Sequence, residues 1–130
     1  MGHIHQRVKL SADKTVTVRM LVDTGATFSV IPEALARAVG VKPLRRSVQI
    51  RLADGRRVRL APSTAIFRIG AREAPATILV GDVIEPILGV ETLEALGLTV
   101  DSQRGRLTPS RSYAVRMGGY RRGRLALPVT

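Results

Sequence analysis

The sequence predicts an all-β domain with one or two short helices. Valine and isoleucine recur at short intervals, alternate with polar residues and are interrupted by turn-forming residues, which is typical of many short strands. A length of 130 residues fits one domain. Because aromatic residues make up only 3% of the chain, the core must consist mainly of valine, isoleucine, leucine and alanine.

The predicted strands follow from local alternation. Residues 7–10 alternate basic and apolar side chains, and residues 15–22 form a second, more apolar strand. The other predicted strands pair as hairpins with a glycine at or near each turn, at Asp54-Gly55, Gly70-Ala71 and Gly105. These hairpins join residues 48–52 with 58–60, 65–69 with 76–80, and 98–100 with 106–108.

Two short helices are predicted between the strands. Residues 32–39 begin with a proline, which is favoured in the first turn, and Gly40 follows them. Residues 91–96 are rich in helix formers, and Gly97 follows at the position where a C-terminal cap is expected.

The pattern of strands ends near residue 109. We therefore assign residues 1–109 to the domain and residues 110–130 to a basic C-terminal extension, either flexible or part of a dimer interface. No acidic residue follows Asp101, whereas seven arginines do, and the whole chain has a formal net charge of +11. This charge could attract nucleic acid, but no nucleic-acid motif accompanies it. We favour a solvated basic surface over nucleic-acid binding through the extension.

Composition also limits which cellular compartment and which cofactors we expect. The chain has no cysteine, which excludes disulfides and thiolate metal sites and fits a reducing compartment. It has no apolar run long enough for a transmembrane helix or a signal peptide. We expect a cytoplasmic protein without membrane association. His3 and His5 near the N-terminus are weak metal-ligand candidates, so we expect no metal and no other cofactor.

One acidic residue stands at the end of an apolar strand. Asp23 follows residues 20–22 and is itself followed by Thr24 and Gly25. A carboxylate at such a position is costly unless it is paired, hydrogen-bonded or protonated, so it indicates a functional role. Gly25 allows a sharp turn. An aspartate in an ordinary turn would give the same tripeptide, which leaves that interpretation open.

Three features, in order along the chain, resemble the retropepsin-like aspartic proteases. Residues 21–27 with 29–31 are similar to the active-site segment of that family. The hairpin at Asp54-Gly55 lies where the family has its flap. Ile87-Leu88-Gly89 and the helix after it resemble the family's apolar-apolar-glycine turn and C-terminal helix. The resemblance covers most of the chain before the basic extension.

The resemblance implies a closed retropepsin-like β-barrel that forms a two-fold symmetric homodimer, since only one Asp-Thr-Gly is present. It implies an aspartic endopeptidase in which two Asp23 carboxylates, one per subunit, share a proton and activate a water molecule. Thr24 would link the two active-site loops across the dimer, and Gly25 would present its carbonyl group to the substrate.

The same resemblance implies a groove for extended protein or peptide substrates. The residues expected to bind the substrate are Ala26, Val30, Ile87 and Leu88 in the pockets and Ala53, Asp54 and Gly55 in the flap. Plain core packing is the alternative for Ile87 and Leu88.

The chain departs from the viral members at two positions. Thr27 and Val90 stand where those members have a paired aspartate and arginine, and the two charges are absent together.

Two alternatives to the protease stay open: a retropepsin-fold module that binds peptides or dimerises without turnover, and a basic nucleic-acid-binding β domain. The retained Asp-Thr-Gly argues against the first, and the scarcity of aromatic residues for base stacking argues against the second.

Overall fold

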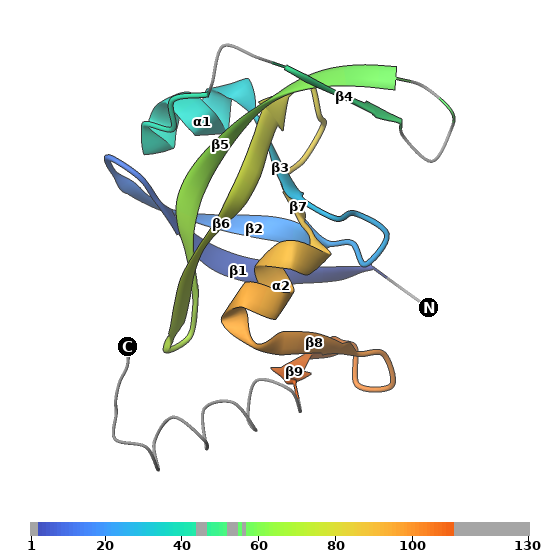
Figure 1. Ribbon diagram of the computed structural model, residues 1–130. Helices are drawn as coiled ribbons and strands as arrows, with labels where there is room; N and C mark the ends of the chain where they lie inside the picture. The colour runs from blue at the N-terminus through green and yellow to red at the C-terminus, as the bar shows by residue number, and fades with distance from the viewer. Residues whose placement is uncertain (1–2, 44–46, 52–54, 56, 111–130) are drawn as a thin grey trace, which may run out of the picture.

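The computed structural model describes residues 3–43, 47–51, 55 and 57–110 (Figure 1). Within these residues seven strands form one sheet, in the order β1-β2-β7-β3-β6-β5-β4, and β1 also pairs with β5. This second pairing closes the sheet, as the expected all-β barrel requires. The seven strands are β1 (Ile4–Ser11), β2 (Thr15–Val22), β3 (Ser29–Pro32), β4 (Val48–Arg51), β5 (Arg57–Ile69), β6 (Arg72–Gly81) and β7 (Ile87–Leu88).

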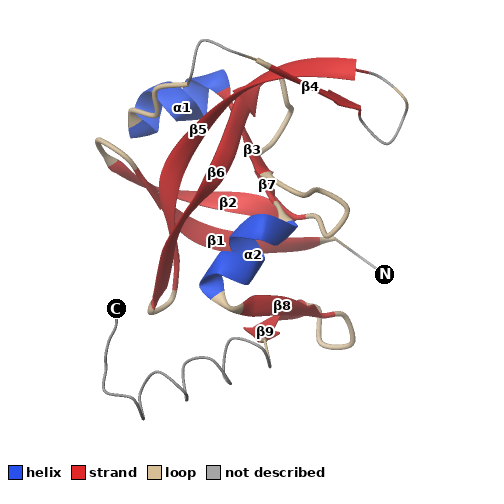
Figure 2. Ribbon diagram, in the orientation of Figure 1, coloured by secondary structure: helices blue, strands red, loops and turns tan. Residues whose placement is uncertain are grey.

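Two short helices and a separate hairpin complete the described fold (Figure 2). Helix α1 (Glu33–Val39) ends at Gly40 and α2 (Val90–Leu96) ends at Gly97, and both glycines adopt left-handed conformations with φ of 84° and 71°. Left-handed backbone favours glycine, which explains why both helices stop there. After α2, strands β8 (Leu98–Asp101) and β9 (Arg106–Pro109) pair with each other.

The alternation in the sequence corresponds to the two faces of the strands. In β1, Val8 and Leu10 are fully buried, whereas Arg7 and Lys9 are exposed. The main core gathers similar buried side chains from β2, β3, β5, β6, β7, β8 and both helices, around one buried aromatic residue, Phe67. The predicted strands at 7–10, 15–22, 98–100 and 106–108 and both predicted helices are therefore confirmed.

Strand β5 corrects one expectation. The sequence predicts separate strands at 58–60 and 65–69, but a single strand runs from Arg57 to Ile69 and includes Pro62. Among the described residues, β4 pairs with β5 only up to Leu60 and β1 only from Ile66. Pro62 thus lies where β5 has β6 alone as a partner, and a residue without an N–H group is tolerated there.

The predictions for two flap residues and for the C-terminal extension concern residues outside the described parts of the chain, except for Ser110. Ala53 and Asp54, at the predicted flap, are outside them, as are residues 111–130. The boundary between the domain and the C-terminal extension therefore stays a prediction. No helix among the described residues is long and apolar enough to cross a membrane.

Candidate active site

Asp23 is the first residue after β2, and backbone and side-chain hydrogen bonds fix its position. Its N–H donates to the carbonyl oxygen of Leu88 at 3.1 Å, and its own carbonyl oxygen accepts from the N–H of Ala26 at 3.1 Å. The N–H of Gly25 donates to Asp23 Oδ1 at 2.9 Å. The carboxylate is thus oriented through one oxygen, while Oδ2 forms no hydrogen bond with any described residue and is available to a ligand.

Two distant segments meet beside this carboxylate. Strands β2 and β7 run parallel, with Leu21 opposite Ile87 and Val22 opposite Leu88. Further along, the N–H of Val90 donates to the carbonyl oxygen of Ala26 at 2.8 Å. The N–H of Glu91 similarly donates to the carbonyl oxygen of Thr27 at 2.9 Å. The Asp-Thr-Gly turn therefore rests on the segment that contains Ile87-Leu88-Gly89.

Gly89 is required at this junction because there is no room for a side chain. A Cβ atom at this position would lie 2.5 Å from the carbonyl carbon and 2.6 Å from the carbonyl oxygen of Phe28, and 2.9 Å from the carbonyl oxygen of Ala26. All three are backbone atoms, which a rotamer change cannot move away. The glycine of the second sequence feature thus permits the close approach of the two segments.

A buried pair of hydroxyl groups supports the same junction. Ser29 Oγ accepts a hydrogen bond from the N–H of Gly89 at 3.0 Å and lies 2.6 Å from Thr92 Oγ1. Both side chains are fully buried. Buried polar groups need such partners, so the pair ties β3 and α2 to the turn at Gly89. Sequence reasoning missed these residues, because a serine and a threonine 63 positions apart carry no local signal of contact.

Asp23 lines a pocket of about 380 Å³. Its walls are mostly apolar, and the lining residues are Asp23, Gly25, Ala26, Thr27, Phe28, Val30, Arg51, Leu60, Leu79, Val83 and Ile87. Apolar walls with a few polar groups are typical of ligand sites. The only charged side chains among these described residues are those of Asp23 and Arg51. Arg51, the last residue of β4, is exposed and forms no ion pair with a described residue.

The structure places some of the predicted site residues here and others elsewhere. Ala26, Val30 and Ile87 line the pocket together with Asp23. The expected role of Leu88 in substrate binding is wrong for this chain, because its side chain is fully buried in the main core. Neighbouring residues of a strand face opposite sides, so Ile87 faces the pocket and Leu88 the core.

The remaining predicted residues are placed as follows. Thr24 is exposed, and its hydroxyl group has no hydrogen-bond partner among the described residues. Gly55 is exposed, has a φ of 89° and does not line the pocket, as far as the described residues define it. No group of three or more histidine, aspartate or glutamate residues in the described chain could hold a metal ion.

A closed barrel with an aspartate after β2 and a glycine turn after β7 defines the retropepsin-like class of fold. Residues 8–95 match the family described as "gag-polyprotein putative aspartyl protease", so the chain belongs to this family of aspartic proteases. Among solved structures, the chain is similar to "EIAV protease complexed with the inhibitor HBY-793", with a TM-score of 0.62 and 23% sequence identity. That match covers 77% of this chain and 93% of the EIAV protease chain. No match was found among curated proteins.

Proposed function

We propose that the protein is an aspartic endopeptidase whose active site forms when two copies pair around a two-fold axis. The supporting observation is the position of Asp23, the only aspartate in an Asp-Thr-Gly sequence, on the wall of an apolar pocket. A two-fold axis near this residue would bring two identical carboxylates together. The exposed hydroxyl group of Thr24 next to it is free to form a hydrogen bond with the second subunit.

The proposed mechanism uses the two carboxylates as acid and base. At close distance the two like charges are not both retained, so the pair holds one proton. The ionised carboxylate accepts a proton from a bound water molecule, which attacks the carbonyl carbon of the scissile bond, while the protonated carboxylate donates to the carbonyl oxygen. When the tetrahedral intermediate collapses, the C–N bond breaks and the carboxyl group that took the proton from water gives it to the amine nitrogen. The other carboxylate takes a proton back from a hydroxyl group of the intermediate, so the pair again holds one proton. The Gly25 N–H holds Asp23 Oδ1 in place during these steps.

The proposed substrate is an extended segment of a protein or peptide with an apolar side chain near the cleavage site. The pocket supplies apolar walls from Ala26, Val30 and Ile87. The residues of the predicted flap, Ala53 to Gly55, would cover the bound segment, with backbone pairing as in other strand-like complexes. We also propose that the protein acts in the cytoplasm, since its composition fits a reducing compartment.

Digestion of a diverse peptide pool, read by mass spectrometry, tests this function. The wild-type protein and Asp23→Asn should be compared at equal concentration, because the amide cannot act as a general base. The proposal predicts cleavage by the wild type and none by the variant, with the same thermal unfolding curve for both. Cleavage by a pure Asp23→Asn sample would exclude the mechanism. Absence of cleavage by a folded, dimeric wild type would favour the peptide-binding module instead.

A further inference from the structure

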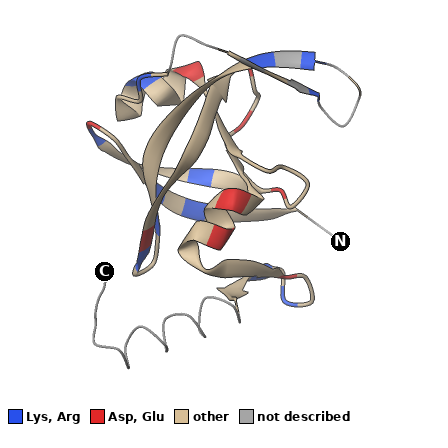
Figure 3. Cartoon of the chain, viewed as in Figure 1, with Lys and Arg blue, Asp and Glu red and all other residues tan. Residues whose placement is uncertain are grey.

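A basic face covers the outer side of the β1–β2 hairpin and the adjacent end of β5. It consists of Arg7, Lys9, Arg19 and Arg68, all four of which are exposed. Figure 3 shows the corresponding bands of basic residues on β1 and β2. Arg7 lies opposite Arg19, and Lys9 lies opposite Arg68. Arg7 and Lys9 are two positions apart on β1 and therefore face the same side, so all four side chains lie on one surface.

The members of the basic face lie opposite each other in two like-charge pairs. Arg7 is the direct partner of Arg19 between β1 and β2, and Lys9 is the direct partner of Arg68 between β1 and β5. Like charges at such positions repel each other and destabilise the sheet. None of the four forms an ion pair with a described residue. Arg68 donates to the carbonyl oxygen of Gly70 at 3.0 Å. A bound anion would relieve this repulsion.

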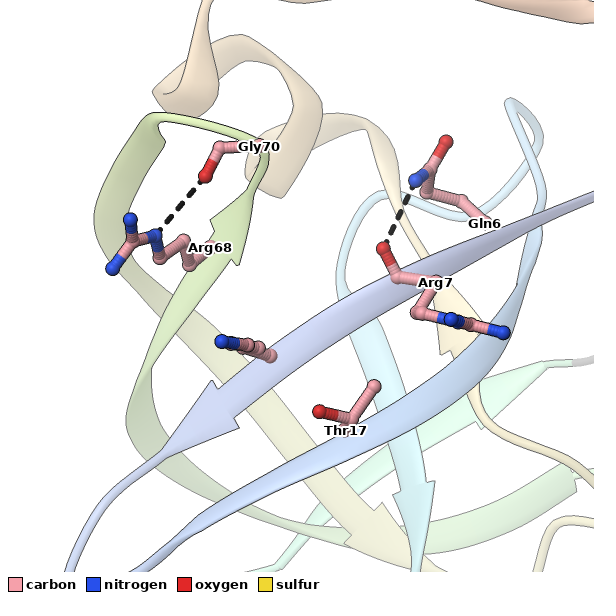
Figure 4. Close-up of a pocket in the computed structure, with 6 residues that line it drawn as sticks. Gln6, Arg7, Thr17, Arg68 and Gly70 are labelled. Carbon is pink, nitrogen blue, oxygen red and sulfur yellow. Dashed lines mark hydrogen bonds between the residues drawn. The ribbon is translucent and has the colours of Figure 1, made fainter.

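The basic face contains a pocket of about 380 Å³, separate from the pocket at Asp23. Its lining residues are Gln6, Arg7, Lys9, Thr17, Arg68 and Gly70 (Figure 4). Figure 4 shows Arg68 on β5 on one side and Arg7 and Thr17 on the facing hairpin. No carboxylate is among these described lining residues. Guanidinium, ammonium and hydroxyl groups together form the donor set that suits a phosphate group.

Few acidic residues among the described ones lie near the basic face, so most of its positive charge is uncompensated. Glu73 is the partner of Arg68 on the β6 side, and His5 at the other end of β1 contacts Glu85 at 3.2 Å. Neither glutamate lines the pocket. The net charge of +11 for the whole chain further favours the approach of a polyanion.

The spacing of the four residues matches an extended polyanion better than a single small anion. Adjacent strands are about 4.8 Å apart, and residues two positions apart along a strand are separated by about 6.6 Å. Arg19, Arg7, Lys9 and Arg68 therefore form a stepped line across three strands. No aromatic side chain is among the described residues that line the pocket, so base stacking does not contribute and the phosphates alone would be recognised.

We propose that the basic face binds the phosphate backbone of double-stranded nucleic acid without regard to sequence. The site shares no lining residue with the pocket at Asp23, so this inference does not depend on the protease activity. Binding would neutralise the two like-charge pairs and release counterions from the nucleic acid.

Fluorescence anisotropy of the full chain with a labelled DNA duplex of about 20 base pairs, over about 50 to 200 mM salt, tests the proposal. The test variant replaces all four members of the basic face by glutamine. A matched control variant has the same loss of charge at exposed positions off the face: Arg37, Lys42, Arg104 and Arg106. The C-terminal extension is present in both variants, so its contribution to binding cancels in the comparison.

The slope of log K against log salt concentration is the quantity to compare. It changes by about 0.9 for each phosphate contact on a duplex, so the face variant should lose about 3.6 in slope and the control variant far less. The double variant Arg7→Gln with Arg19→Gln should lose about half as much, about 1.8, which provides a second test if the quadruple variant does not fold.

Three results would overturn the proposal. The first is absence of salt-dependent duplex binding by the wild type. The second is an equal loss of slope in the face and control variants, which would mean that binding depends on overall charge alone. The third is binding of polyglutamate as tightly as the duplex, with the same loss of affinity in the face variant. That result would indicate a site for acidic polypeptides rather than nucleic acid.

Discussion

Replacement of Gly89 by alanine should separate the two segments that form the candidate active site. The new Cβ atom would lie 2.5 Å from the carbonyl carbon of Phe28. This is about 1 Å closer than an ordinary carbon–carbon contact, so the backbone must move by a similar amount. That movement would lengthen the hydrogen bonds from Val90 to Ala26 and from Glu91 to Thr27, now 2.8 and 2.9 Å, beyond the usual range.

The expected loss of unfolding free energy follows from these two effects. Overpacking costs about 1–3 kcal/mol, and each lost hydrogen bond costs about 0.5–1.5 kcal/mol. Together they give about 2–6 kcal/mol, a large part of the roughly 5–15 kcal/mol that is typical of a domain. Equilibrium urea unfolding followed by circular dichroism measures this loss, with equal protein concentration for all samples because a dimer would make stability depend on concentration.

Gly105→Ala is the matched control for this substitution. Gly105 has a φ of 66°, but no atom lies within 4 Å of the position that an added Cβ would take, so only the left-handed backbone conformation is penalised. That penalty is about 1–2 kcal/mol. If Gly89→Ala proved no less stable than Gly105→Ala, the steric explanation for the glycine after Ile87-Leu88 would be refuted.

Three further substitutions test separate parts of the account. Thr24→Ala removes the hydroxyl group proposed to join the subunits, so the dimer dissociation constant should rise about tenfold in sedimentation experiments, and an unchanged constant would count against that role. Ser29→Ala leaves the Gly89 N–H and the Thr92 hydroxyl group without their buried partner, so urea unfolding should show a loss of about 1–3 kcal/mol; a loss no larger than at an exposed serine would contradict this. Arg51→Glu should lower kcat/KM about fivefold for peptides with an acidic residue beside the apolar one and leave neutral peptides unchanged, and an equal effect on both kinds would exclude a role in selectivity.

The strands that could be predicted from sequence are those whose own residues specify them. Residues 15–22 and the hairpins with a glycine turn combine alternation with a local turn signal, and the structure has strands there. Strands β3 and β7 could not be predicted because no local turn joins either of them to a partner strand. They exist through pairing with distant segments, such as Ser29 with Ile78 and Leu21 with Ile87, and no local pattern reports such contacts.

The candidate site likewise contains some residues that the sequence reveals and others that it does not. Asp23, Ala26, Val30 and Ile87 could be located because they belong to two short motifs. The other wall of the pocket comes from β4, β5 and β6 and from the loop after β6, through Arg51, Leu60, Leu79 and Val83. Nothing in the neighbourhood of those four residues distinguishes them from ordinary strand residues, so only the tertiary structure reveals them.

Leu88 illustrates what a motif does not specify. The motif gives two adjacent apolar residues before Gly89, and the family resemblance implies that both line the substrate pocket. Adjacent residues in a strand face opposite sides, so at most one of them can reach the pocket. Leu88 is the residue on the core side, with no exposed surface.

Mixed dimers test the central claim, that two Asp23 carboxylates from two subunits form one active site. Equal amounts of wild type and Asp23→Asn would be unfolded, refolded together and compared with the same total amount of wild type in peptide cleavage. Random pairing makes about a quarter of the dimers fully wild type, so a shared active site predicts about a quarter of the wild-type activity. Half of the wild-type activity would show that each subunit cleaves with its own Asp23 alone, which would contradict a shared active site.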